Sequence, residues 1–443
     1  MVNIADFQSK ISPSFWKHIR KNTYVEWIDF PNDKSEFLKG VYDKIINGTY
    51  APSPPREYVV LNKHNAVARI VPSLTLEDYC VYYFCVVSLE EYLAQDRTEG
   101  TFGGFRLGGQ LREKEDNEFN EFEEIPFSVS PFTYNPLAWV SAWRDFQKKA
   151  YVLYSREGSY SHFLKFDIAN FYNTINLTIL ERKIRLACPK ETSEIIDILI
   201  FFLKNWNKKF LQYAEQTVSI PQDEVGDCSR ILANFYLQDY DKKIKALCDE
   251  NKCKYMRYAD DQILMSDDKE AAEKILFEAS KELFKIGLNI NSSKVERFPT
   301  REAWNYYWCF DIFDLLGDKN DTENITKAIN LLLQLDRSNC RASSVVSRIL
   351  NCNLDQVQFD LKIKFISEVI SDDFLLNASS RILLRIYELL DENSKAQFID
   401  KLHSLSKKAI FNSYHFNVLR AKQNGLPIDY ESELKDRIKE LSL

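Results

Sequence analysis

The sequence predicts an α+β fold, in which an antiparallel sheet covered by helices is followed by an all-α part. Glycine is scarce, at 12 of 443 residues, and Leu, Ile, Phe and Tyr recur throughout, as is typical of a mostly helical protein. Short apolar segments with strand character all precede residue 297. After residue 315 the pattern consists of helices separated by short polar turns, which indicates a bundle or a helical repeat.

Composition and charge narrow the class of protein. The chain is 45% hydrophobic and can bury a large core, and its net charge of −7 argues against a protein that grips long duplex nucleic acid through many phosphates. The sequence shows neither a secretory leader nor an apolar run long enough to cross a bilayer, so we expect a cytoplasmic protein that does not use the membrane. Nine scattered cysteines without a CxxC pair favour reduced, buried thiols over a zinc site.

The first half of the chain yields a hairpin, a loop, a strand and several helices. YVVLN and AVARIVP form the hairpin, with Lys63 to Asn65 at its tip. GTFGGFRLGGQ lacks the strand and helix context of a dinucleotide or phosphate site, so we interpret it as an ordinary loop. HFLKFD is a short apolar strand that ends at Asp167. Helices are predicted over 74–95, 177–187 and 191–206.

The second half begins with two more helices and a strand. The helix 227–247 is amphipathic, with Asp227 as its N-cap, and the helix 269–285 ends near Gly287. GLNIN follows as the last strand. The C-terminal helices are predicted over 323–335, 341–350, 355–371, 374–390, 393–406 and 413–423.

MRYADDQILM, residues 256–265, places two adjacent carboxylates between two short strand segments. The segment is predicted to be a hairpin whose tip presents Asp260 and Asp261. The two carboxylates repel each other, and a cation beside them would offset this repulsion. A solvated turn is the alternative, because Asp favours turns on its own account.

The order of elements favours the metal site over the solvated turn. The chain reads β-α-β-hairpin-α-β, the connectivity of a ferredoxin-like antiparallel sheet, in which the first strand neighbours the hairpin. Asp167 is therefore predicted to lie beside Asp260. Such carboxylates hold two divalent ions about 3.5–4 Å apart in enzymes of phosphoryl transfer, and hard oxygen ligands favour Mg²⁺.

Five segments in this order resemble the motifs of reverse transcriptases. The segments are ARIVPS, FDIANFY, SIPQDEVGDCSRILANFYL, MRYADDQILM and GLNINSSK. The likeness spans residues 56–297 and implies reverse-transcriptase-like fingers and palm over residues 1–315, followed by an α-helical repeat domain over 316–443. It also implies a nucleotidyltransferase that uses two Mg²⁺ ions and deoxynucleoside triphosphates.

The resemblance assigns roles to residues around the predicted metal site. Asp167 and Asp260 would be metal ligands, Asp261 a ligand or a supporting carboxylate, and Ile168 would contribute its backbone carbonyl. Tyr172 falls at the family's steric gate, where an aromatic ring excludes a ribose 2′-hydroxyl; the alternatives are a core tyrosine or Phe171 as the gate.

Further residues would bind the nucleotide. Lys63 and Arg69 match fingers residues that hold the triphosphate, although Lys63 would also suit a solvated hairpin. Gln222 would line the nucleotide pocket. Lys294 would approach the phosphates, with a surface lysine as the alternative.

The sequence departs from the general family pattern in two places. Asp223, Glu224 and Asp227 follow Pro221-Gln222, where template and primer phosphates would pass, and no basic, glycine-marked thumb follows residue 297. Both features resemble the abortive-infection (Abi) group of bacterial reverse-transcriptase-like DNA polymerases.

The Abi resemblance implies template-independent DNA synthesis that starts from a protein hydroxyl, during antiphage defence. The single-stranded DNA product would be attached to a tyrosine, which the 23 tyrosines of the chain do not identify, and we expect a homo-oligomer. A template-directed reverse transcriptase of the retron or group II intron kind is the main alternative. A catalytically idle palm that displays the helical domain to a partner is the third reading.

Overall fold

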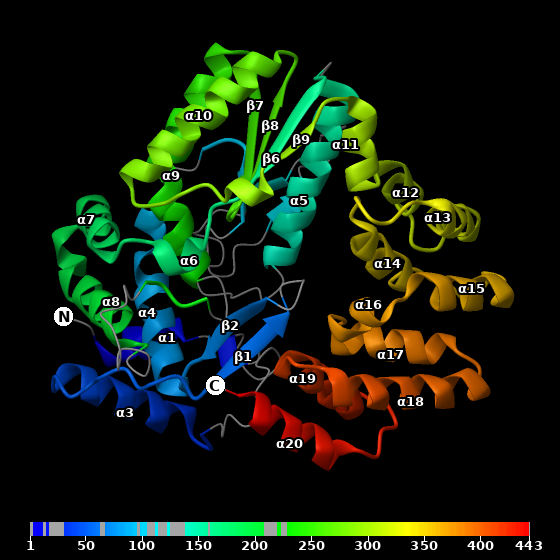
Figure 1. Ribbon diagram of the computed structural model, residues 1–443. Helices are drawn as coiled ribbons and strands as arrows, with labels where there is room; N and C mark the ends of the chain where they lie inside the picture. The colour runs from blue at the N-terminus through cyan, green and yellow to red at the C-terminus, as the bar shows by residue number, and fades with distance from the viewer. Residues whose placement is uncertain are drawn as a thin grey trace. The chain divides into compact units, whose positions relative to one another are not determined.

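In a computed structural model, the chain forms two compact units (Figure 1). The first unit comprises Met1–Glu57 and Pro72–Arg301, and the second comprises Tyr58–Val71 and Glu302–Leu443. The domain boundary predicted after residue 315 thus falls inside the second unit. The structure describes residues 3–11, 15–16, 31–62, 67–94, 98–103, 111–113, 122–124, 138–157, 160–207, 219–222 and 228–442.

A five-stranded sheet organises the first unit. Its order is β3 (Thr101–Phe102), β7 (Lys254–Tyr258), β8 (Asp261–Ser266), β6 (His162–Phe166) and β9 (Glu296–Phe298). β7, β8, β6 and β9 are antiparallel to their neighbours, whereas β3 runs parallel to β7. The expected pairing of the first strand with the hairpin is confirmed, because β6 pairs with β8.

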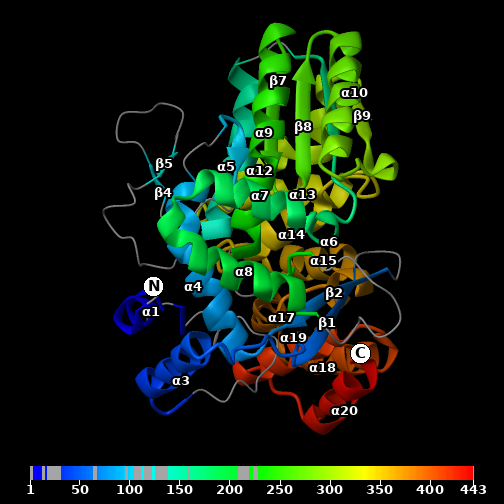
Figure 2. The ribbon, with the colours of Figure 1, turned by 90° about the vertical axis from the view of Figure 1, so that its left-hand side faces the viewer.

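Helices cover both faces of this sheet. Figures 1 and 2 show α9 (Cys228–Glu250) and α10 (Lys269–Lys285) along one face, with α5 (Ala138–Val152) on the other. Asp268 caps α10 by accepting hydrogen bonds from the backbone N–H groups of Glu270 and Ala271. The predicted helix 269–285 is therefore confirmed at both ends, while Asp227, the predicted cap of α9, lies outside the described residues.

The remaining helices of the first unit surround α4 (Leu76–Leu93), which is buried on nearly all sides. A helix that is apolar all round belongs in a core, and α4 packs against α8 and α9 there. The other elements are α1 (Ile4–Lys10), α3 (Lys34–Ile46), α6 (Phe171–Thr174), α7 (Leu177–Ala187), α8 (Ser193–Asn205), β4 (Leu111–Glu113), β5 (Phe122–Glu124), and the short helices η2 (Leu153–Glu157) and η3 (Lys190–Thr192).

Two predictions in this unit are wrong in detail. GLNIN forms an isolated bridge, Ile168 to Ile290, because the chain then turns into the 3₁₀ helix η5 (Ser292–Lys294) before β9 begins. The glycine-rich loop contains a strand, β3. Gly100 adopts a φ of +89°, and a Cβ there would lie 2.5 Å from the Tyr255 carbonyl oxygen, so glycine lets the backbone approach β7 closely enough to pair.

The second unit is helical apart from one hairpin. Its helices are α11 (Arg301–Trp308, whose first residue belongs to the first unit), α12 (Phe310–Leu315), α13 (Thr322–Gln334), α14 (Ala342–Leu350), α15 (Phe359–Val369), α16 (Asp372–Leu376), α17 (Ser380–Leu389), α18 (Glu392–Lys408), α19 (Asn412–Gln423) and α20 (Glu431–Leu441). The helix predicted over 374–390 is two helices, because the chain is extended at Ser379. α20 was missed by the sequence prediction.

Arginines satisfy the carbonyl groups at several helix ends in this unit. Arg348 donates to the Leu316 carbonyl oxygen at 2.7 Å, after α12. Arg385 donates to the carbonyl oxygen of Leu350, the last residue of α14, at 3.2 Å, and Arg437 to that of Ala409, after α18, at 3.2 Å. The last carbonyls of a helix have no partner within it, so these side chains join one helix to another and stabilise the array.

The predicted hairpin is present as β1 (Glu57–Asn62) and β2 (Ala68–Ser73), and it packs on α19. Asn412, which is fully buried, accepts a hydrogen bond from the Val60 N–H at 2.7 Å and donates to the Tyr58 carbonyl oxygen at 3.1 Å. One amide thus continues the hydrogen bonding of the strand, which explains why the hairpin belongs to the second unit.

The cysteines and the helices bear on two expectations from composition. None of the nine cysteines, all of which the structure describes, forms a disulfide, and eight are buried. No described helix combines the length and apolar character needed to cross a membrane.

Candidate active site

Asp167 and Asp261 adjoin the same end of one strand pair. β6 ends at Phe166, which pairs with Gln262 of β8. Asp167 follows Phe166 in the chain, and Asp261 precedes Gln262. Asp260 lies in the turn immediately before Asp261.

Asp167 is buried, with 6% of its surface exposed. Its Oδ2 accepts a hydrogen bond from the Lys294 ammonium at 2.5 Å. Its Oδ1 is also buried, and no described residue donates a hydrogen bond to it. A buried carboxylate oxygen without a partner is costly. A hard divalent cation, for which such an oxygen is a preferred ligand, would satisfy it. Asp167 therefore fits the expected metal site.

Asp261, like Asp167, has a lysine ammonium close to its carboxylate. The Lys165 ammonium lies 3.9 Å from Asp261 Oδ1 and 3.5 Å from Glu296 Oε2. Within the described part of the chain, no group of three or more His, Cys, Asp or Glu side chains is drawn together as a metal-binding cluster. In this structure, lysine ammonium groups are what compensate Asp167 and Asp261.

The turn that carries Asp260 has an unusual backbone. Ala259 adopts a φ of +52°, in the left-handed region that residues other than glycine rarely occupy. Its carbonyl oxygen accepts a hydrogen bond from Arg257 at 2.8 Å. Strained residues of this kind persist where surrounding contacts hold them, and they cluster at functional sites.

Arg257 belongs to a buried polar network beneath the turn. It is fully buried and binds Asp241 of α9 through Nε at 2.8 Å and Nη2 at 2.5 Å, while its Nη1 donates to Asn234 Oδ1 at 2.7 Å. Burial opposes its charge, but the contacts with Asp241 more than offset this and raise the pKa of Arg257. Burial, followed by the charge of Asp241, raises the pKa of Tyr255, which donates to the same carboxylate at 2.9 Å.

Sequence reasoning missed Arg257 and Asp241. The available signal was one arginine within the apolar hairpin strand, because a cation on a buried strand needs a buried partner. The partner lies 16 residues earlier, on a helix, and the sequence alone does not identify it.

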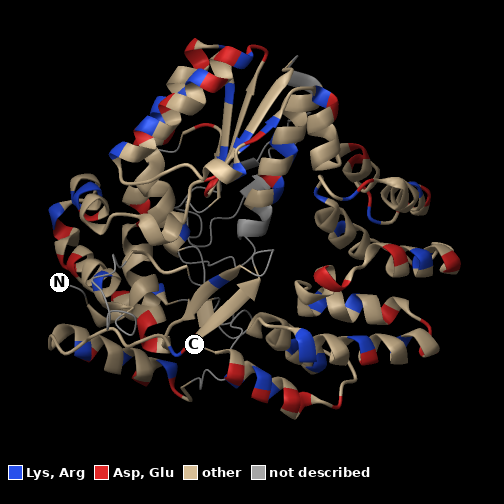
Figure 3. Cartoon of the chain, in the orientation of Figure 1, with Lys and Arg blue, Asp and Glu red and all other residues tan. Residues whose placement is uncertain are grey.

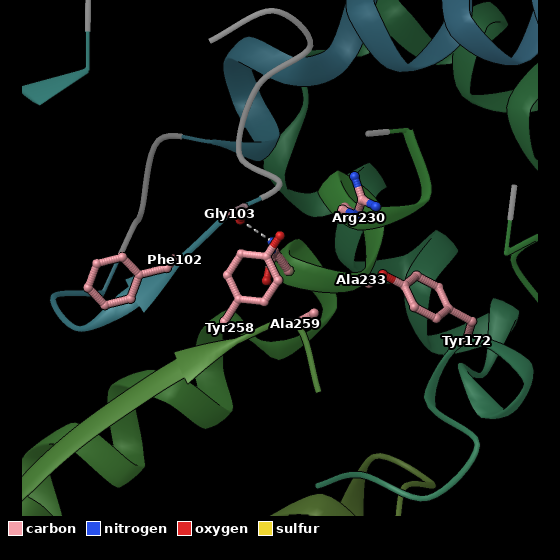
Figure 4. Close-up of a pocket in the computed structure, with 8 residues that line it drawn as sticks. Phe102, Gly103, Tyr172, Arg230, Ala233, Tyr258 and Ala259 are labelled. Atoms are coloured by element: carbon pink, nitrogen blue, oxygen red, sulfur yellow. Dashed lines mark hydrogen bonds between the residues drawn. The ribbon is translucent and has the colours of Figure 1, made fainter. Parts of the chain in front are cut away.

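Tyr172 lies in a small pocket beside the turn (Figure 4). In Figure 4 the Tyr172 ring lies beside Ala233 of α9, the Tyr258 ring lies across the pocket beside Ala259, and Arg230 lies above them. Phe171, the alternative gate, is only 3% exposed and is buried in the core cluster. The pocket is lined by Phe102, Gly103, Tyr172, Arg230, Ala233, Asn234, Tyr258 and Ala259.

For the other predicted site residues, the structure describes few contacts or none. Gln222 is half-buried, next to Pro221, whose carbonyl oxygen accepts a hydrogen bond from Ser229 of α9. At Ile168, the bridge to Ile290 is closed by the Asp167 carbonyl and the Ala169 N–H, so it does not use the Ile168 carbonyl. Arg69 lies half-buried on β2, in the second unit. Lys63, Asp223, Glu224 and Asp227 lie outside the described residues.

A protein-family model matches part of the chain. Residues 130–307 match the model described as reverse transcriptase (RNA-dependent DNA polymerase). These residues include β6, the β7–β8 hairpin and Lys294.

Comparison with individual proteins gives weaker likenesses. The Retron Ec83 reverse transcriptase of Escherichia coli is 29% identical over 103 residues, which are 23% of this chain and 30% of that protein. This chain therefore spans less than a third of that relative. Telomerase of Candida albicans with a TWJ fragment of telomeric RNA has a TM-score of 0.32 at 12% identity, covering 93% of this chain and 68% of its own. Apo telomerase of Candida tropicalis has a TM-score of 0.34 at 12% identity, covering 92% of this chain and 72% of its own.

Proposed function

Because residues 130–307 form a reverse-transcriptase-like polymerase domain of the nucleotidyltransferase class, we propose that the chain is a Mg²⁺-dependent DNA polymerase. The observation that carries this proposal is the environment of Asp167. Its carboxylate is buried, keeps one oxygen without a described donor, and follows the residue of β6 that pairs with Gln262, the neighbour of Asp261. Most buried side-chain oxygens have a hydrogen-bond partner, and a bound metal ion would account for this exception.

The metal site would be formed by Asp167, Asp260, Asp261 and the Ile168 carbonyl. When bound, two Mg²⁺ ions supply charge stabilisation for in-line transfer of a nucleotidyl group. The surrounding residues would bind and select the nucleotide.

Five side chains would select and orient the nucleotide. Lys63 and Arg69 would bind the triphosphate, and Gln222 would line the nucleotide pocket. Lys294 would reach the phosphates from its place beside Asp167. Tyr172 would exclude a ribose 2′-hydroxyl, since it lines the pocket that adjoins Ala259.

We further propose that synthesis is template-independent and protein-primed, and that it acts in antiphage abortive infection, as the Abi resemblance implies. The palm would be of the ferredoxin-like type, and the helices of the second unit would form a helical repeat. Recurring arginine contacts at the helix ends support the repeat. Charges of both signs alternate along α10, which supports a surface that does not grip a long duplex (Figure 3).

Labelled deoxynucleotides test this proposal directly. Purified protein with Mg²⁺, labelled dNTPs and no template or primer is expected to acquire label on the protein band in denaturing gels. Asp167→Ala and Asp260→Ala are expected to lose the label while keeping the wild-type melting temperature. Absence of label on the wild-type protein would contradict protein priming.

A template-directed reverse transcriptase is the second candidate, and the likeness to the retron enzyme favours it. Products whose sequence follows an added RNA template would decide for this candidate. An idle palm is a third. Phage protection that survives Asp260→Ala would decide for the idle palm and against both polymerases.

A further inference from the structure

Lys294 is tied to Asp167 through both its side chain and its backbone. The ammonium binds Asp167 Oδ2 at 2.5 Å. The Asn291 N–H donates to the Asp167 carbonyl oxygen at 2.9 Å, and the Lys294 N–H donates to that of Asn291 at 3.0 Å. The short helix η5 therefore carries this lysine to the end of β6, and its position does not depend on the ion pair alone.

The two lysines differ in how firmly they are held. The Lys294 side chain is 51% exposed and its paired carboxylate is Asp167, which is 9% exposed. The Lys165 side chain is 20% exposed and is shared between Asp261 and Glu296 at 3.9 and 3.5 Å. A half-exposed lysine on a flexible stem can leave its partner, whereas Lys165 is held within the sheet by two acids.

An ammonium on Asp167 Oδ2 disfavours a divalent cation on Oδ1 of the same carboxylate, because the two positive charges repel each other. A triphosphate offers an alternative partner for the ammonium. Its arrival would draw the ammonium away from Asp167, while the charge of the triphosphate also attracts the cation. Lys294 would then couple the two binding events.

We propose that Lys294 is a positioning residue that occupies Asp167 in the absence of nucleotide, so that nucleotide and divalent cation bind cooperatively. This inference rests on the proposed polymerase function and specifies how nucleotide binding and cation binding are coupled. The free protein binds the cation weakly, and a nucleotide raises that affinity by drawing Lys294 away. By reciprocity, the cation raises nucleotide affinity by the same factor.

Binding of Mn²⁺ to the full chain, followed by electron paramagnetic resonance, tests the coupling without any turnover. Titrations would be made with and without an α,β-imido deoxynucleotide, and corrected for Mn²⁺ held by the free analogue. We expect the analogue to tighten Mn²⁺ binding to the wild type about tenfold, as expected for one charge-assisted contact. Lys294→Met should bind Mn²⁺ about tenfold tighter than wild type without nucleotide and should lose most of the coupling.

Three variants make the measurement specific. Lys165→Met should tighten Mn²⁺ binding less than Lys294→Met, because its ammonium lies farther from the carboxylate. Lys294→Arg should restore weak binding in the free protein. Lys285→Met is the matched control, since Lys285 also lies 2.5 Å from its partner, Glu282, and is 58% exposed, but lies on α10.

The possible failures are distinguishable. Equal Mn²⁺ affinity of Lys294→Met and wild type, in a wild type that incorporates dNTPs, would overturn this inference alone. If Asp167→Asn leaves Mn²⁺ binding unchanged with and without the analogue, the metal site is elsewhere. The proposed function would then fail together with the inference.

Discussion

Arg257 and Asp241 form a buried ion pair that joins β7 to α9, with contacts of 2.8 and 2.5 Å. The same guanidinium holds the Ala259 carbonyl oxygen, one residue before Asp260. Because all three contacts come from one planar group, the position of the turn depends on the pair. The turn that carries Asp260 is therefore held in place by Arg257, which is not itself one of the proposed metal ligands.

Asp241→Asn should be strongly destabilising. The substitution leaves the Arg257 charge buried without a counter-ion, which costs about 3–5 kcal/mol. The free energy of unfolding, from urea titrations, measures this loss. Glu323→Gln is the control, because the exposed pair Glu323–Lys327 is screened by solvent and contributes little to stability. Equal stability of the two variants would show that the buried pair is not required.

Gly100→Ala should destabilise the edge of the sheet. The residue combines a φ of +89° with a Cβ position 2.5 Å from the Tyr255 carbonyl oxygen, and its own carbonyl accepts from the Arg257 N–H at 2.9 Å. Gly48→Ala measures the cost of a positive φ without a steric clash, because the φ of Gly48 is +67° and nothing lies within 4 Å of its Cβ position. Urea unfolding should show a loss of about 1 kcal/mol for Gly48→Ala and about 3 kcal/mol for Gly100→Ala. Similar losses would mean that the close approach is unimportant.

Tyr172→Ala should admit ribonucleotides. The ring lines the pocket next to Ala259, so its removal opens space where a 2′-hydroxyl would lie. The measurement is the ratio of dNTP to NTP incorporation, which we expect to fall by about tenfold or more, as expected for the loss of a steric contact. Tyr172→Phe keeps the ring and should keep the ratio. Unchanged selectivity in Tyr172→Ala would reject the assignment of the gate.

Local pattern was sufficient to predict the elements that carry the candidate site. The apolar strand ending at Asp167 and the hairpin around Asp260 are short, regular segments bounded by turn residues, and both are present. Their pairing followed from the order of elements, because few topologies accommodate a β-α-β-hairpin-α-β chain.

Contacts between distant residues could not be predicted in the same way. Asn412 binds the strand of a hairpin some 350 residues earlier, and no local pattern marks it. Lys294 was expected near phosphates, but its contact with Asp167 depends on the turn at η5, which follows the predicted strand GLNIN and was not itself predicted. β3 is only two residues long, too short for an alternating pattern, and it depends on the glycine before it.

His415 should make the second unit sensitive to acid. The ring is fully buried on α19, with Nε2 2.9 Å from the Ser406 carbonyl oxygen and Nδ1 3.2 Å from that of Phe411. Burial lowers the pKa of His415 in spite of these contacts. The unfolded chain therefore binds a proton at a higher pH than the folded one, so stability is complete above the ordinary pKa of about 6.5 and falls as the pH drops below it.

The expected loss is at most about 1.4 kcal/mol per pH unit, and it stops below the folded pKa. Urea midpoints between pH 5 and 7.5, followed by circular dichroism, measure it. His415→Gln should flatten this dependence, because the side chain no longer titrates. His403→Gln is the matched control and should retain the dependence, since His403 is partly exposed and pairs with Glu433 at 2.9 Å. An unchanged pH profile in His415→Gln would assign the acid sensitivity to other groups.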